Sequence, residues 1–147
     1  MNTTPQSKSS LASPYILIFR DTDPDRYKEM TADQRARYLK QWSDWYQRLA
    51  EQGKTKLCNP LAPERRLVSG SRGQHVVDGP FAESKEEIVG FFLLNVLDLE
   101  EATTIAKECP GLAQGMVVEL RAVVDMYRSS QTFEMQAAGL AGGSDRK

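Results

Sequence analysis

The pattern of apolar and polar residues predicts four strands in the main part of the chain. Nearly continuous apolar runs at 15–19 and 88–96 are typical of strands buried on both faces. The segment 55–58 is a shorter strand that ends before an Asn-Pro pair. Alternation across 115–123 predicts a last strand with one face partly solvated.

A long helix is predicted after the first strand. Thr31 and Gln34 form a capping box at its start, in which each side chain satisfies the other residue's backbone N–H, and Gly53 is a natural end. Apolar and aromatic residues then recur at spacings of three and four, so that one stripe of the helix packs on a sheet. The stripe consists of Leu39, Trp42, Tyr46 and Leu49, widened by Tyr38 and Trp45.

A second helix and a hairpin complete the predicted elements. The helix is capped by Asp98 and Glu101 and stops before Pro110, which cannot continue it. The β-prone runs 66–70 and 74–78 flank a Gly-Ser-Arg-Gly turn and predict the hairpin. Without the hairpin the order is βαββαβ, the arrangement of a ferredoxin-like α+β fold.

The apolar strands also predict how the domain associates. Two helices cover only one face of such a sheet, and strands as apolar as 15–19 and 88–96 need cover on the other face. We therefore expect a homodimer in which two copies pack sheet face against sheet face.

Length and charge narrow the class of protein. The 147 residues suit one domain at 14–124, between a flexible tail at 1–13 and a partly flexible extension at 125–147. A net charge of −1 disfavours nucleic-acid binding, and no apolar run is long enough to span a membrane. The polar start argues against a secretory signal, so we expect a cytoplasmic location.

The cysteines indicate neither a disulfide framework nor a metal site. Cys58 and Cys109 are far apart in the sequence, and the chain holds one histidine. We expect reduced thiols, with a cross-link only if the strand and helix that carry them are neighbours. No metal-ligand cluster, phosphate-binding glycine loop or cofactor motif is present, so no cofactor is predicted.

One segment identifies a family. The stretch VVDGPFAESKEEIVGFFLLNV, with DLEEATTIAKECPG and VVELRAV after it, resembles the YCII-related family over residues 14–124, and in particular its DGPF-motif branch. The resemblance implies a ferredoxin-like homodimer of the dimeric α+β barrel type, with a cleft between sheet and helices. The signature residues are Asp78, Gly79, Pro80, Phe81, Glu83, Lys85 and Glu86.

The resemblance gives a weaker indication of chemistry. The broader family includes enzymes with a His–Asp pair, and relatives are similar to dehydrochlorinases and muconolactone-type isomerases. The family histidine lies near the start of the first long helix, where this sequence has none. His75 lies on the predicted hairpin instead, so the pair does not carry over, although Asp78 matches the aspartate of the motif.

Asp78 is the candidate catalytic residue, with two interpretations left open. Burial beside an apolar wall would make it a general base. Alternatively, it accepts hydrogen bonds from backbone N–H groups of residues 81–84 and holds a tight corner, which the Asp-Gly-Pro sequence favours. His75 shares a strand face with Val77 rather than with Asp78.

The candidate ligand-binding residues surround the expected cleft. Arg20 ends the first strand and is suited to gripping a carboxylate, while Trp42, Trp45 and Phe81 would line the cleft. The alternative for the aromatic residues is packing in the core.

Three functions follow in order of preference. The first is binding or sensing of a small molecule, and the second is a cofactor-independent lyase, isomerase or hydrolase that uses Asp78 for proton transfer. The third is an interaction module linked to transcription, because some DGPF-branch proteins are encoded beside extracytoplasmic-function sigma factors.

Overall fold

The computed structural model describes residues 13–80 and 86–124. The tails predicted at the two ends therefore lie almost wholly outside the described residues. The elements, in chain order, are β1 (Ser13–Asp21), the 3₁₀ helix η1 (Pro24–Glu29), α2 (Ala32–Glu51), β2 (Thr55–Pro60), β3 (Arg65–Ser69), β4 (His75–Gly79), β5 (Glu87–Val96), α3 (Leu99–Ala106), the 3₁₀ helix η2 (Pro110–Gln114) and β6 (Val117–Ala122).

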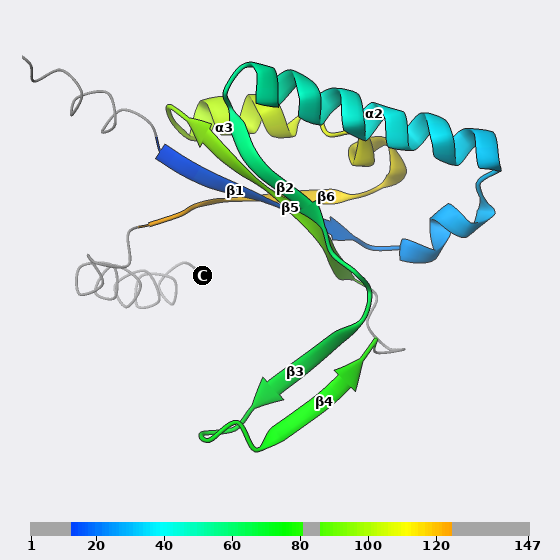
Figure 1. Cartoon of the computed structure of the whole chain (residues 1–147), viewed down its shortest axis with the longest axis vertical. Helices are drawn as coiled ribbons and strands as arrows, with labels where there is room; N and C mark the ends of the chain where they lie inside the picture. The colour runs from blue at the N-terminus through cyan, green and yellow to red at the C-terminus, as the bar shows by residue number, and fades with distance from the viewer. Residues whose placement is uncertain (1–12, 81–85, 125–147) are drawn as a thin grey trace, which may run out of the picture.

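The main sheet has four antiparallel strands in the order β2-β5-β1-β6. The two helices α2 and α3 lie together on one face of this sheet (Figure 1). The strand order, with one helix in each crossover, is that of a ferredoxin-like fold, so the predicted α+β class is confirmed.

Aromatic packing joins α2 to the sheet. Trp45 is buried and stacks on Phe92 of β5, with ring centroids 4.8 Å apart and an interplanar angle of 26°. Phe19 of β1 meets both rings edge-on. Leu17 and Leu94 fill the space beside them and are also fully buried. Removing a buried ring such as Trp45 costs about 3–5 kcal/mol, so this cluster is a main source of stability.

The starts of both helices follow the predicted chemistry. The Thr31 hydroxyl accepts a hydrogen bond from the backbone N–H of Gln34, and the Gln34 side chain accepts one from the N–H of Thr31. Asp98 accepts a hydrogen bond from the backbone N–H of Glu101 in the same way. Both predicted caps are confirmed.

The structure contains two short 3₁₀ helices that were not predicted from the sequence. η1 and η2 begin with Pro24 and Pro110, whose fixed φ and missing N–H suit a first helical turn. Helices this short show no periodic pattern of apolar residues, so the sequence does not reveal them. Of the two, η1 is important for the site, because it brings side chains to the face of the sheet that α2 and α3 cover (the covered face).

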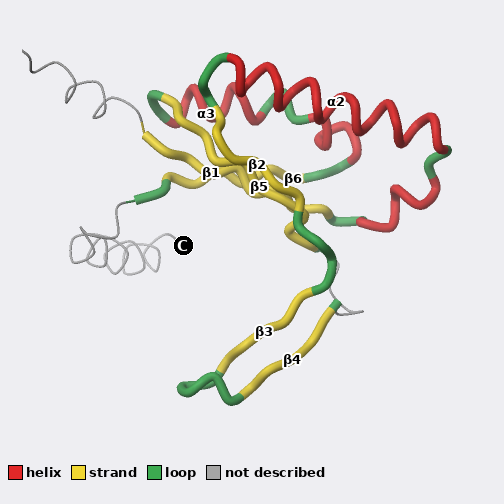
Figure 2. Tube along the Cα trace, in the orientation of Figure 1, coloured by secondary structure: helices red, strands yellow, loops and turns green. Residues whose placement is uncertain are grey.

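Strands β3 and β4 pair with each other in a separate two-stranded sheet. In the sequence, this hairpin lies between β2 and β5. This hairpin projects from the domain on the side away from the helices (Figure 2). Its turn uses Gly70 and Gly73, whose φ angles of +94° and +69° lie in the left-handed region that favours glycine. Its apolar side chains are exposed on both faces: Leu67, Val68, Val76 and Val77.

The face of the main sheet opposite the helices carries no further layer among the described residues (Figure 1). Ile16, Ile18, Phe91 and Leu93 are only half-buried there, while Leu57 is 47% exposed. In the described part of the chain, none of the helices combines the length and the apolar character needed to cross a membrane.

Candidate functional site

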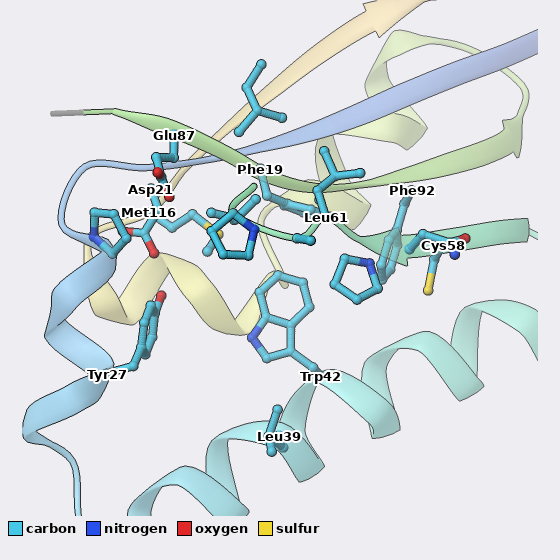
Figure 3. Close-up of a pocket in the computed structure, with 18 of the residues that line it drawn as sticks. Phe19, Asp21, Tyr27, Leu39, Trp42, Cys58, Leu61, Glu87, Phe92 and Met116 are labelled. Atoms are coloured by element: carbon cyan, nitrogen blue, oxygen red, sulfur yellow. The ribbon is translucent and has the colours of Figure 1, made fainter. Parts of the chain in front are cut away.

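A pocket of about 1030 Å³ lies between α2, the covered face of the sheet and the segment that follows β2 (Figure 3). Its walls are predominantly apolar and include one face of the α2 stripe. Leu39 of that stripe is 67% exposed and lines the pocket, so the stripe is not wholly covered by the sheet. The aromatic lining residues are Phe19, Tyr27, Tyr38, Trp42, Tyr46 and Phe92.

An irregularity in the sheet shapes one wall. The pairing of β1 with β5 shifts between Phe19 and Arg20, which leaves Val89 as an extra residue in β5. The backbone carbonyl of Val89 accepts a hydrogen bond from the N–H of Leu61 (2.9 Å) and so holds the segment after β2. A Cβ on the neighbouring Gly90 would lie 3.0 Å from the Asn59 carbonyl oxygen, so glycine permits this close approach.

A buried carboxylate lies at one end of the pocket. Asp21 is 0% exposed, and its Oδ1 accepts a hydrogen bond from the backbone N–H of Asp23 (3.0 Å). Its Oδ2 has no hydrogen-bond partner among the described residues. Because an unsatisfied buried polar atom costs about 1–3 kcal/mol, a further hydrogen-bond donor at this oxygen would be stabilising.

Two tyrosines flank this carboxylate. Tyr27 of η1 stacks on Tyr38 of α2, with ring centroids 5.4 Å apart and hydroxyl oxygens 3.3 Å apart. Figure 3 shows the Tyr27 hydroxyl directed toward Asp21. Burial raises the pKa of Tyr27 well above its usual value, and hydrogen bonds with the Tyr38 hydroxyl and with the Asp21 carboxylate raise it further. Tyr27 therefore stays a neutral phenol at physiological pH.

The charged residues of the lining are mostly acidic. Four carboxylates, those of Asp21, Glu64, Glu86 and Glu87, accompany one guanidinium, that of Arg65. Arg65 and Glu87 form an ion pair. The lining thus keeps an excess of negative charge.

The structure places Arg20 on the opposite face of the sheet from the pocket. Its neighbours Phe19 and Asp21 are buried on the covered face, and Arg20 pairs with Glu86 (2.8 Å) and Glu119 (2.5 Å). The hydrogen bond with Glu86 and then that with Glu119 raise the pKa of its guanidinium. Arg20 is not among the residues that line the pocket.

The predicted aromatic ligand residues separate into three cases. Trp42 lines the pocket and meets Phe19 edge-on, with centroids 5.0 Å apart. Trp45 is 1% exposed and belongs to the core behind the pocket. Phe81 lies outside the described residues, as do Glu83 and Lys85 of the motif.

Asp78 lies on the hairpin, away from the pocket lining. Its Oδ1 accepts a hydrogen bond from Nε of Arg66 (2.6 Å), directly opposite in the ladder, and both side chains are about two-thirds exposed. His75 is also exposed and pairs with Ser69. A general base at Asp78 would require a buried carboxylate, and in the single chain this carboxylate is exposed. The alternative, a corner held by hydrogen bonds to residues 81–84, lies outside the described residues. Catalysis by Asp78 stays a prediction.

Both cysteines are free thiols. Cys58 lines the pocket, and burial raises the pKa of its thiol. Burial also raises the pKa of Cys109 to about 11. Protonated thiols are poor nucleophiles, so neither cysteine is poised for covalent chemistry at neutral pH. Within 13–80 and 86–124, three or more metal-binding side chains do not gather at any point.

Asp21 and Tyr27 were missed from the sequence. The first strand was predicted to end at residue 19, whereas β1 continues to Asp21. The available signal was alternation: Leu17, Phe19 and Asp21 occupy every second position, so extending the strand by two residues would have put the carboxylate on the covered face. No comparable signal marked Tyr27.

Comparison with known proteins agrees with this fold. A family model for the YCII-related domain matches residues 7–127. An uncharacterized protein of Rhizobium meliloti (strain 1021) is 38% identical over 68 residues. That match covers 40% of this chain and 55% of the relative, so the chain matches only about half of the relative's length.

The position of Asp78 leads to a prediction about stability. Because exposed ion pairs contribute at most about 1 kcal/mol, Asp78→Asn should lower the free energy of unfolding by no more than this. Arg66→Gln removes the same pair and should give a matching change, measured by denaturant unfolding. A loss of several kcal/mol in Asp78→Asn alone would contradict this, and would show that Asp78 also holds the corner after β4.

Proposed function

The chain belongs to the YCII-related domain family, and on this basis we propose that it binds a small, largely apolar molecule in the pocket between α2 and the sheet. The observation that carries the proposal is the open aromatic pocket of about 1030 Å³. Ligand sites are concave and mostly apolar, with a few polar groups placed to orient the ligand.

The packing of Trp42 supports this use of the pocket. On the next turn of α2, Phe92 covers Trp45, so that Trp45 is buried and not accessible to a ligand. Trp42 lines the pocket beside the half-buried Cys58 and Tyr46. A ligand that filled this space would continue the apolar packing that the sheet provides around Trp45.

We further propose that two copies form a dimer of the α+β barrel type through the bare faces of their sheets. The half-buried Ile16, Ile18, Phe91 and Leu93 form the centre of that face in a single chain. A twofold axis would pack this apolar patch against its own copy, the usual arrangement in homodimers. The exposed apolar hairpin projects on the same side as this face and would add to the contact.

Other functions remain predictions from the sequence. These are proton transfer at Asp78, association with sigma factors and a cytoplasmic location. The described residues provide no observation that supports any of the three.

The pocket can be tested with a neutral fluorescent probe. Wild-type protein should bind N-phenyl-1-naphthylamine saturably, with enhanced probe fluorescence, because the probe is apolar and much smaller than the pocket. Cys58→Phe places a ring inside the pocket and should weaken binding about tenfold, which corresponds to 1.4 kcal/mol. The adjacent Leu57 faces the opposite side of β2, so Leu57→Phe is the control and should leave the affinity within about twofold. Unsaturable binding to wild type, or equal affinities of the two variants, would contradict the proposal.

The dimer can be tested by light scattering. The wild type should show twice the mass of a 16.5 kDa chain. Ile18→Asp puts a charge into the bare face and should give a single-chain mass, whereas Leu99→Asp on the exposed start of α3 should stay dimeric. A single-chain mass for the wild type would refute the proposed dimer.

A further inference from the structure

We propose that the pocket recognises a protonated amine carried on an apolar, preferably aromatic, body, with Asp21 as its counter-ion. This inference rests on the proposed function, since it names the chemical class of the ligand that enters the same pocket. It depends on Asp21, on the rings beside it and on the charge of the lining.

Asp21 is a buried acceptor whose hydrogen-bonding capacity is not fully used among the described residues. The residue is 0% exposed and its carboxylate forms a hydrogen bond with the Tyr27 side chain, but in this part of the chain its Oδ2 lacks a well-aligned donor and Asp21 forms no ion pair. Its other oxygen is occupied by the backbone N–H of Asp23. Since Asp21 lines the pocket, a donor carried by a ligand would supply the missing partner.

The rings beside this oxygen suit a cation. Tyr27, Tyr38 and Trp42 form a continuous aromatic wall, in which Tyr27 stacks on Tyr38 and Tyr38 meets Trp42 edge-on at 6.2 Å. An ammonium group within about 6 Å of such a ring is attracted to the negative face of the π system. The high pKa of Tyr27 keeps its hydroxyl neutral, so it is available to accept a hydrogen bond from the ligand as well.

Three arginines lie near the pocket, and one of them lines it. Arg65, in the lining, forms its ion pair with Glu87, and Arg20 pairs with Glu86 and Glu119 from the far face of the sheet. Arg26 of η1 lies against Gly115 and within 3.8 Å of Asp23, outside the lining; its buried Nη1 has no hydrogen-bond partner among the described residues.

The balance of charge separates an amine from other ligands. Glu86 is paired with Arg20 and Glu87 with Arg65, so the excess negative charge of the lining comes from Asp21 and Glu64, and an anionic ligand would meet net repulsion from them. A neutral alcohol or amide would satisfy Oδ2 of Asp21 but would leave its charge uncompensated in a poorly solvated position. A protonated amine supplies both the donor and the opposite charge.

Three probes that differ only in the terminal group test the inference by calorimetry. They are 2-(2-naphthyl)ethylamine, 2-(2-naphthyl)ethanol and 3-(2-naphthyl)propanoate, which present an ammonium, a hydroxyl and a carboxylate on the same ring and linker. Wild-type protein should bind the amine at least about tenfold more tightly than the alcohol, and the carboxylate most weakly.

Variants then assign the preference to Asp21. Asp21→Asn should remove the advantage of the amine and leave the affinity for the alcohol within about twofold, whereas Asp78→Asn, on the exposed hairpin, should keep the wild-type order. If Asp21→Asn does not fold, the wild-type order of the three probes still decides the question.

The outcomes distinguish this inference from the proposed function. Tight binding of the alcohol with no gain for the amine, or a preference for the carboxylate, would overturn the amine inference while the apolar pocket stands. Retention of the amine preference in a folded Asp21→Asn variant would overturn the role of Asp21. Binding of none of the three probes would overturn both.

Discussion

The stacking of aromatic rings between α2 and the covered face of the sheet is the interaction on which the rest of the structure depends. Trp45 lies on Phe92 and is met edge-on by Phe19, which fixes the distance and rotation of the long helix relative to β1 and β5. Trp42, one turn earlier, points to the same side but has less of the sheet to cover it. The same stripe of one helix thus forms the core at one point and the wall of a pocket at the next.

The pleat of β1 gives this pocket its chemical character. Arg20 and Asp21 are adjacent in the sequence but point to opposite faces of the sheet, so these two opposite charges do not pair. Arg20 finds Glu86 and Glu119 on the bare face, whereas Asp21 is left among aromatic residues with one oxygen unsatisfied. A one-residue alternation therefore places the carboxylate of Asp21, and not the guanidinium of Arg20, at the polar end of an apolar pocket.

The fold was more predictable than the site for a physical reason. Helix caps such as Thr31 and apolar runs such as 88–96 report on local bonds and on burial that the sequence pattern encodes directly. The partners of Asp21 and Arg20 depend on how far β1 extends and on where η1 turns back, which are tertiary properties. Asp78, which the motif makes conspicuous, lies in an exposed ion pair, while the inconspicuous Tyr27 lies beside the buried carboxylate.

A crystal structure of the protein with 2-(2-naphthyl)ethylamine bound would show directly whether Asp21 holds the amine. We expect the amine nitrogen at hydrogen-bond distance, about 3 Å, from Oδ2 of Asp21, with the naphthyl ring in the pocket against Trp42. A naphthyl ring outside this pocket, or an amine nitrogen directed to Glu64 or Glu86 while Oδ2 of Asp21 stays unpartnered, would contradict this expectation.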